Sequence, residues 1–268
     1  MDNLLKKICD DKKKEIIENK KKCSYKTLEK LLPSNETKRH FKNSLIKAQA
    51  NKKNFIIGEI KKSSPSAGNI IKDYYPEELA LIYEKAGVGA ISILTEKNYF
   101  EGQIDHLSLI KKRTKLPILR KDFIIDEYQI LESKVYCADA ILLIVSILND
   151  NELKQYIKIA EEIKLDCIIE THNEDEINIA IDIGYPIIGI NNRNLKNLST
   201  NINNTLNLVK KIDKNFTVIG ESGIKSIDDI KKYNELEIYN FLIGETLLKA
   251  QDKEKKIKEL LGNDQSLK

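Results

Sequence analysis

Residues 166–191, DCIIETHNEDEINIAIDIGYPIIGIN, contain a complete strand–helix–strand unit. Two short apolar runs, 166–170 and 187–191, flank an amphipathic stretch at 173–183 that begins with Asn173. Asparagine is a favoured residue at helix N-termini. The two runs are almost wholly apolar rather than alternating, which is typical of parallel strands that are covered on both faces. The stretch therefore predicts two parallel strands joined by a helix.

The same alternation repeats from residue 55 to the end of the chain. Further β-rich runs occur at 55–60, 90–94, 117–121, 139–145, 216–221 and 240–243. Further amphipathic stretches lie at 76–86, 126–135, 151–163 and 226–233. Eight strand–helix units in 268 residues favour a closed (β/α)8 TIM barrel over an open doubly wound sheet. We therefore expect one α/β domain over residues 1–268, with the barrel at 55–262.

The first 54 residues differ from the rest because they are lysine-rich and periodic at helical spacing. One apolar stripe consists of Leu4, Ile8, Ile16 and Ile17, and another of Phe41, Leu45 and Ile46. They predict an N-terminal extension of two helices over residues 1–54. The lysine runs 12–14 and 20–22 are interspersed with acidic residues, which predicts exposed helix faces rather than a surface for nucleic acid.

Composition argues against several other classes of protein. Lys+Arg total 45 against 41 Asp+Glu, a net charge of only +4, so no polyanionic partner is expected. The longest apolar run, 138–148, is interrupted by Asp139 and Ser146 and is too short to span a bilayer. Neither a zinc site, a redox dithiol nor a disulfide framework is suggested by Cys9, Cys23, Cys137 and Cys167. We expect a soluble cytoplasmic protein without metal, cofactor or membrane partner.

Polar residues interrupt the predicted strands at their C-terminal ends, where barrel enzymes carry their active sites. These residues are Glu59, Lys61, Lys121, Glu170, Asn191, Arg193 and Glu221. Residues two apart on a strand share a face, so Glu59 and Lys61 should project together into the barrel mouth. Each group alone has a structural explanation: a local ion pair for Glu59, an exposed loop for Lys121, a helix cap for Glu170. A cluster of desolvated charges at one end of a barrel is more typical of an active site.

The last two predicted units favour phosphate binding. Ser222 and Gly223 follow the seventh strand, and Gly244 and Glu245 follow the eighth. Glycine allows close approach of the backbone to a ligand, and these two loops often bind phosphate in such barrels. We expect the Glu245 side chain to point away from the anion. His172, two residues after Glu170, is expected to act behind the site or on the surface.

Several blocks of sequence resemble the indole-3-glycerol phosphate synthase family, in order and at family-like spacing. They are EIKKSSPS (59–66), LTEK (94–97), LRKDFIID (119–126), INNRNL (190–195), GESGI (220–224) and FLIGE (241–245). The resemblance implies ring closure, decarboxylation and dehydration of 1-(2-carboxyphenylamino)-1-deoxyribulose 5-phosphate in tryptophan biosynthesis. The sequence departs from the family pattern at Tyr136-Cys137, where a small residue and glycine are usual, and at Gly220 and Ala67. These departures bear on local packing rather than on the activity.

The resemblance also implies residue roles. Lys121 would be the general acid, Glu170 the general base, and Glu59 and Asn191 assisting catalytic residues. The implied substrate-binding residues are Lys61, Ser64, Phe100, Phe123, Arg193, Glu221, Ser222, Gly223, Gly244 and Glu245. Lys61 and Arg193 would face the substrate carboxylate, and the phenylalanines would stack on its aromatic ring.

Two alternative functions stay open. One is another phosphate-binding barrel isomerase or epimerase, although such reactions do not need the set formed by Glu59, Lys61, Lys121 and Glu170. The other is a catalytically inactive barrel that serves as a binding protein. We expect a monomer that binds a phosphorylated small molecule, with association with other tryptophan-pathway enzymes as a further alternative.

Overall fold

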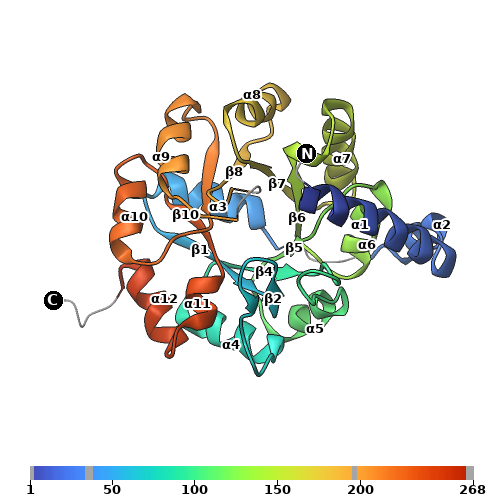
Figure 1. Ribbon diagram of the computed structural model, residues 1–268, viewed down its shortest axis with the longest axis horizontal. Coiled ribbons are helices and arrows are strands. Elements are labelled where there is room, and N and C mark those ends of the chain that lie inside the picture. The colour runs from blue at the N-terminus through green and yellow to red at the C-terminus, as the bar shows by residue number, and fades with distance from the viewer. Residues whose placement is uncertain (1–2, 34–38, 195–197, 264–268) are drawn as a thin grey trace.

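The computed structural model describes residues 3–33, 39–194 and 198–263, so Leu195 of the INNRNL block lies outside the described residues. Eight parallel strands form a closed barrel in the order β1-β10-β9-β8-β7-β6-β5-β4, surrounded by helices (Figure 1). The strands are β1 Phe55–Ile60, β4 Ala90–Leu94, β5 Ile118–Lys121, β6 Ala140–Ile144, β7 Asp166–Thr171, β8 Ile187–Asn191, β9 Thr217–Glu221 and β10 Asn240–Ile243. The predicted (β/α)8 TIM barrel is confirmed, and each predicted strand is present within one residue at either end.

The helices of the barrel pack outside the strands, and several of them are capped by local polar residues. They are α4 Pro76–Ala86, α5 Asp105–Arg113, α6 Glu127–Val135, α7 Asp150–Glu162, α8 Glu174–Ile183, α9 Asn203–Leu208, α10 Ile227–Asn234, α11 Glu245–Lys249 and α12 Lys253–Leu261, with short 3-10 turns η1 Val145–Ile147 and η2 Val209–Lys211. Asn173 accepts a hydrogen bond from the Glu176 backbone N–H, and Ser226 forms a capping box with Asp229. These caps fix where each helix leaves the strand end that precedes it.

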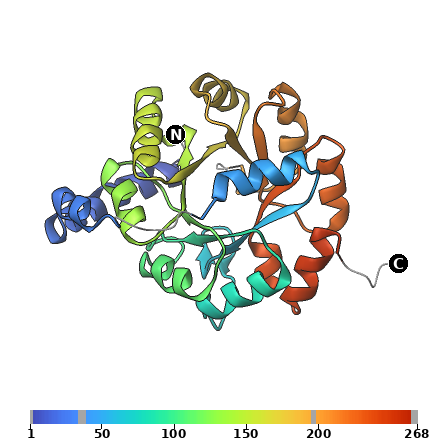
Figure 2. The same cartoon turned by 180° about the vertical axis from the view of Figure 1, so that it is seen from behind.

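The N-terminal extension contains three helices, so the prediction of two is wrong. They are α1 Asn3–Lys22, α2 Tyr25–Leu31 and α3 Phe41–Ala50. The short α2 begins after Ser24, whose hydroxyl accepts from the Thr27 backbone N–H, and it has too few turns to show an apolar stripe. Helix α1 lies at the end of the barrel nearer the viewer in Figure 1, whereas α3 crosses the opposite end in Figure 2.

Single residues of the extension also correct the sequence predictions. Lys13 and Lys14 are exposed as predicted, but Lys12 is only 2% exposed because it pairs with acidic groups. Ile17 and Ile46 were assigned to apolar stripes and are 55% and 39% exposed. Periodicity identified α1 and α3, but it could not separate the buried residues from their neighbours at the edge of each stripe.

Two local features were not visible in the strand pattern. A two-stranded hairpin, β2 Ser63–Ser64 with β3 Gly68–Asn69, forms in the loop after β1. Cys137, which stands where the family usually has glycine, adopts a φ of 68°. That left-handed conformation favours glycine, which explains the usual residue. Within the described part of the chain, no helix is long and apolar enough to cross a membrane.

Candidate active site

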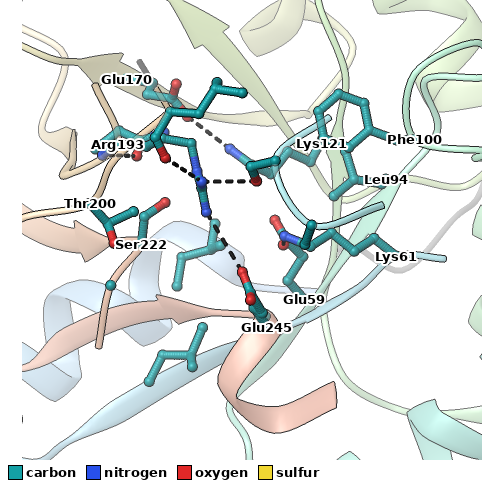
Figure 3. A pocket seen from close by; sticks show the side chains of 18 of the residues that line it. Glu59, Lys61, Leu94, Phe100, Lys121, Glu170, Arg193, Thr200, Ser222 and Glu245 are labelled. Carbon is teal, nitrogen blue, oxygen red and sulfur yellow. Dashed lines mark hydrogen bonds and ion pairs between the residues drawn. The ribbon is translucent and has the colours of Figure 1, made fainter. Parts of the chain in front are cut away.

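A cavity of about 650 Å³ opens at the C-terminal ends of the barrel strands (Figure 3). Of the predicted site residues, its lining includes Glu59, Lys61, Phe100, Lys121, Phe123, Glu170, Asn191, Arg193, Ser222, Gly223, Gly244 and Glu245. Strand ends distant in sequence therefore present their polar side chains to one space, as the barrel geometry requires. The two remaining residues, Ser64 and Glu221, do not line this cavity.

Lys121 lies at the centre of the charged groups. From the end of β5, its Nζ donates to Glu170 Oε2 at 2.8 Å and to Glu221 Oε2 at 3.4 Å (Figure 3 shows the Glu170 contact). Glu170 and Glu221 are only 3% and 1% exposed, so the ammonium is a charged partner for two largely buried carboxyl groups. Glu221 thus contacts Lys121 from inside the barrel, and its predicted role in substrate binding stays a prediction.

The two carboxyl groups have opposite pKa shifts. Burial favours the neutral form of both, but Lys121 and His172 outweigh it at Glu170 and hold the pKa of that carboxyl well below its usual range. At Glu221 burial dominates, and together with the charge of Glu170 it raises the pKa of Glu221 to about 8. Burial opposes the charge of Lys121, but Glu170 and Glu221 outweigh it and raise the pKa of the lysine. At neutral pH the structure thus favours an ionised Glu170 beside an ammonium group.

His172 supports Glu170 from the other side. Its Nε2 lies 3.3 Å from Glu170 Oε1, and its Nδ1 lies 3.0 Å from Glu176 Oε2 on α8. Burial opposes its protonation, but these two carboxylates raise the pKa of His172 to about 10, so the ring is cationic at neutral pH. The expectation of a role behind the site agrees with these contacts, although the ring also lines part of the cavity.

Glu59 and Lys61 project from β1 and the residue after it toward the same space. Lys61 Nζ lies 2.5 Å from Glu59 Oε1, and both side chains line the cavity, as their two-residue spacing predicts. Gly244 makes this position of Glu59 available, because a methyl group on Gly244 would lie 2.3 Å from Glu59 Oε1. The close approach of β10 to β1 explains the need for glycine here.

Arg193 forms the wall opposite Lys61. Its Nη1 donates to Ser66 Oγ and to the Leu198 carbonyl, each at 2.9 Å, and its backbone N–H donates to Asn191 Oδ1 at 3.0 Å. The guanidinium is thus fixed, but it retains donors toward the cavity. Glu245 Oε2 lies 3.8 Å from Arg193 Nη2 (Figure 3).

Glu245 therefore lies on the cavity wall, between Arg193 and Lys249, whose Nζ is 2.5 Å from Glu245 Oε1. The expectation that this side chain points away from the anion stays a prediction, although the carboxylate lines the cavity. It lies there because α11 begins at Glu245, directly after β10, and the two cations on either side attract the carboxylate.

The loops after β9 and β10 form a region suited to an anion. Ser222 and Gly223 have φ values of 63° and 81°, and consecutive left-handed residues curve the backbone into a concave turn. Lys225 and Lys249 line the same cavity and add positive charge. Sequence reasoning missed both lysines, because in a lysine-rich chain their position after a strand gives no distinctive signal.

An apolar wall completes the cavity. The rings of Phe100 and Phe123 have centroids 6.2 Å apart, and Leu5 of α1 lies with them in the lining. Ser64 instead lies beside a smaller adjoining pocket, where its hydroxyl contacts Ser66 Oγ at 3.3 Å. The hairpin β2–β3 places it there, and this hairpin was not predicted. Phe100, Phe123 and Leu5 thus give one side of the cavity an apolar surface.

Comparisons with known proteins agree with this geometry. The family model described as indole-3-glycerol phosphate synthase matches residues 5–260. Among curated relatives, the indole-3-glycerol phosphate synthase of Thermoanaerobacter pseudethanolicus is 44% identical over 258 residues, 96% of this chain and 97% of the relative. The enzyme of that name from Caldanaerobacter subterraneus subsp. tengcongensis is 46% identical over 259 residues, again 96% and 97% of the two chains.

Solved structures show the fold at much lower identity. KGPDC from Streptococcus mutans superposes with a TM-score of 0.60 at 14% identity, covering 79% of this chain and 97% of that one. The 3-hexulose-6-phosphate synthase from Salmonella typhimurium gives 0.62 at 13%, covering 78% and 97%. These two likenesses concern the barrel alone.

Proposed function

The chain belongs to the indole-3-glycerol phosphate synthase family, and from that premise we propose which side chains carry each step of the family reaction. The reaction converts 1-(2-carboxyphenylamino)-1-deoxyribulose 5-phosphate into indole-3-glycerol phosphate, carbon dioxide and water. One observation carries the assignment: a buried ammonium, Lys121, lies 2.8 Å from a buried carboxylate, Glu170, in the cavity at the strand ends. This pair supplies an acid and a base within reach of one bound molecule.

Ring closure is assigned to Lys121. The aryl carbon that bears the carboxylate attacks the ketose carbonyl carbon, and the carbonyl oxygen gains negative charge as the new carbon–carbon bond forms. The Lys121 ammonium donates a proton to that oxygen, which thereby becomes a hydroxyl group. Glu59, which lies close to this centre, adds negative charge that keeps the lysine protonated before the substrate enters.

Decarboxylation follows because the attacking aryl carbon has become tetrahedral, which interrupts the aromaticity of the ring. The carbon–carboxylate bond breaks, its electron pair returns to the ring, and carbon dioxide leaves. Lys61 and Arg193 are assigned to the substrate carboxylate, since both are cationic and line the cavity. Phe100 and Phe123 provide the apolar surface for the aromatic ring.

Dehydration is assigned to Glu170 as the base. It removes the proton from the carbon next to the hydroxyl-bearing carbon, while a protonated group helps the hydroxyl leave as water. Asn191 and Glu59 are assigned to holding the intermediate between these groups. Glu170 can accept the proton because His172 and Lys121 hold it ionised.

The phosphate is assigned to the two last loops. Ser222, Gly223 and Gly244 present backbone at the concave turn, and Lys225 and Lys249 add positive charge. This places the phosphate at the opposite side of the cavity from the phenylalanine wall. The substrate would therefore extend across the charged centre, with its ketose carbon near Lys121.

The activity is tested by incubating the protein with the carboxyphenylamino-deoxyribulose phosphate and following indole fluorescence. The chain has no Trp, so product emission rises over a low background. We expect steady turnover by the wild type and its near-complete loss in Lys121→Ala and in Glu170→Gln, with circular dichroism spectra unchanged. Near-normal turnover in either folded variant would refute that residue's proton-transfer role, and a folded, inactive wild type would refute the assigned activity.

A further inference from the structure

Helix α1 is fastened across the C-terminal end of the barrel by polar contacts to the loops after β4 and β5. Tyr99 donates to Asp11 at 2.7 Å, and Lys20 Nζ lies 2.7 Å from Asp126. Between these contacts, Lys12 Nζ lies 3.1 Å from Asp122 Oδ1. The first two contacts are partly exposed and contribute little by themselves. The third is buried.

Lys12 differs from its neighbours in the same lysine run. Its side chain is 2% exposed, against 67% for Lys13 and 77% for Lys14. A buried ammonium costs several kcal/mol of desolvation unless charged partners surround it. Glu15 at 2.8 Å and Asp122 at 3.1 Å are those partners. The cost of this arrangement suggests that the contact does more than attach a helix.

Asp122 is contacted by four groups, which come from α1, from the loop after β4 and from its own stretch at the end of β5. Lys12 and the Phe123 backbone N–H contact Oδ1, at 3.1 and 2.8 Å. Oδ2 accepts from Thr95 Oγ1 at 2.6 Å and from Arg120 Nη2 at 3.1 Å. Burial opposes ionisation, but Lys12 and Arg120 outweigh it and lower the pKa of Asp122 to about 2. The carboxylate is therefore a fixed, buried anchor at the cavity wall.

The residues on either side of this anchor face the cavity. Lys121 precedes Asp122 and Phe123 follows it, and both line the cavity. Asp122 itself also belongs to the cavity lining, but its side chain is only 1% exposed. Because the three residues are consecutive, the position of its carboxylate constrains the backbone that carries Lys121 and Phe123. A shift of Asp122 would move the ammonium and the aromatic ring together.

We propose that Lys12 is a positioning residue, which acts through Asp122 to hold Lys121 and Phe123 in their working positions. Arg120 cannot replace it, because Arg120 belongs to β5 itself and divides its guanidinium between Asp122 and Glu132. Lys12 brings its charge from a separate helix, so it makes the catalytic geometry depend on how α1 is docked. The inference rests on the proposed role of Lys121.

Lys12→Met tests the proposal, because it removes the cation and keeps an unbranched apolar chain. We expect kcat to fall by roughly ten- to a hundredfold, since a displacement of about 1 Å can cost up to about a hundredfold. Lys12→Arg, which keeps a cation, should recover most of that loss. Lys13→Met is the matched control and should leave kcat unchanged, because Lys13 pairs only with Asp10 at the exposed surface.

A double-mutant cycle separates positioning from simple stabilisation. If Lys12 acts through Asp122, Lys12→Met in an Asp122→Asn background should cost almost no further kcat. All rates are taken well below each variant's melting temperature, with folding checked by circular dichroism. If Lys12→Met does not fold, Lys12→Gln replaces it, and its kcat should lie between those expected for Lys12→Met and the wild type.

Two outcomes would overturn the inference. One is a folded Lys12→Met or Lys12→Gln enzyme that melts earlier but keeps wild-type kcat, which indicates a purely structural contact. The other is additive loss of kcat in the double mutant. Neither outcome affects the assigned activity, which depends on turnover by the wild type and on its loss in Lys121→Ala.

Discussion

Gly244 should tolerate no side chain without disturbing Glu59. A methyl group there would lie 2.3 Å from Glu59 Oε1 and 3.0 Å from both Cβ and Cδ of the same side chain. Ordinary contact begins near 3.4 Å, so the oxygen must retreat by about 1 Å, which disrupts its 2.5 Å ion pair with Lys61. Because a shift of about 1 Å in a reacting constellation costs up to about a hundredfold, Gly244→Ala should lower kcat by roughly ten- to a hundredfold.

The measurement is kcat and KM from indole fluorescence, together with the thermal melting temperature. Gly220→Ala is the matched control, because its methyl group would lie 2.9 Å from a ring carbon of Tyr233, on the helix side of the barrel. This control should lose stability and keep its kcat. If Gly244→Ala folds and retains kcat within about twofold of the wild type, Glu59 does not need its observed position and the reasoning fails.

Three further results are expected. Gly223 has a φ of 81°, so Gly223→Val should distort its loop and raise KM more than it lowers kcat. Inhibition by inorganic phosphate should weaken in parallel. An unchanged KM would show that this loop does not bind the phosphate. His172 should stabilise the fold fully below its ordinary pKa of 6.5 and lose this effect as pH rises through about 10. The free energies of urea unfolding of the wild type and of His172→Gln should therefore converge over that pH window. A constant difference would contradict the pairing of His172 with Glu170 and Glu176. Cys137→Gly should raise the free energy of unfolding by up to about 1 kcal/mol, since φ is 68° there, and a decrease would show that the thiol's contacts outweigh the strain.

The barrel itself was predictable because each strand is a short, mainly apolar run and five of the strands carry a polar residue near their C-terminal end. The two-residue spacing of Glu59 and Lys61 correctly indicated that both face the cavity, since strand alternation is a local property. Glu221 shows the limit of the same rule. It stands at the end of β9 but lies inside the barrel beneath Lys121, and only the register between strands decides that depth.

Contacts between distant segments were the part that the sequence did not reveal. Lys12 was read as one residue of an exposed run, because its partner Asp122 lies on another element and no local pattern connects them. Leu5 of α1 lines the cavity for the same reason. The hairpin that turns Ser64 away has strands of two residues, too short for any alternation to be recognised.

Closure of the barrel between β1 and β10 has a consequence for how the enzyme is made. Phe55 pairs with Asn240, and Glu59 contacts Gly244, so groups of one site come from the first and the last strand of the barrel. A nascent chain that lacks β10 leaves two strand edges unpaired, and such edges invite association with other chains. Contacts of this sequence separation also form slowly. Turnover should therefore begin only after β10 has paired with β1 and closed the barrel.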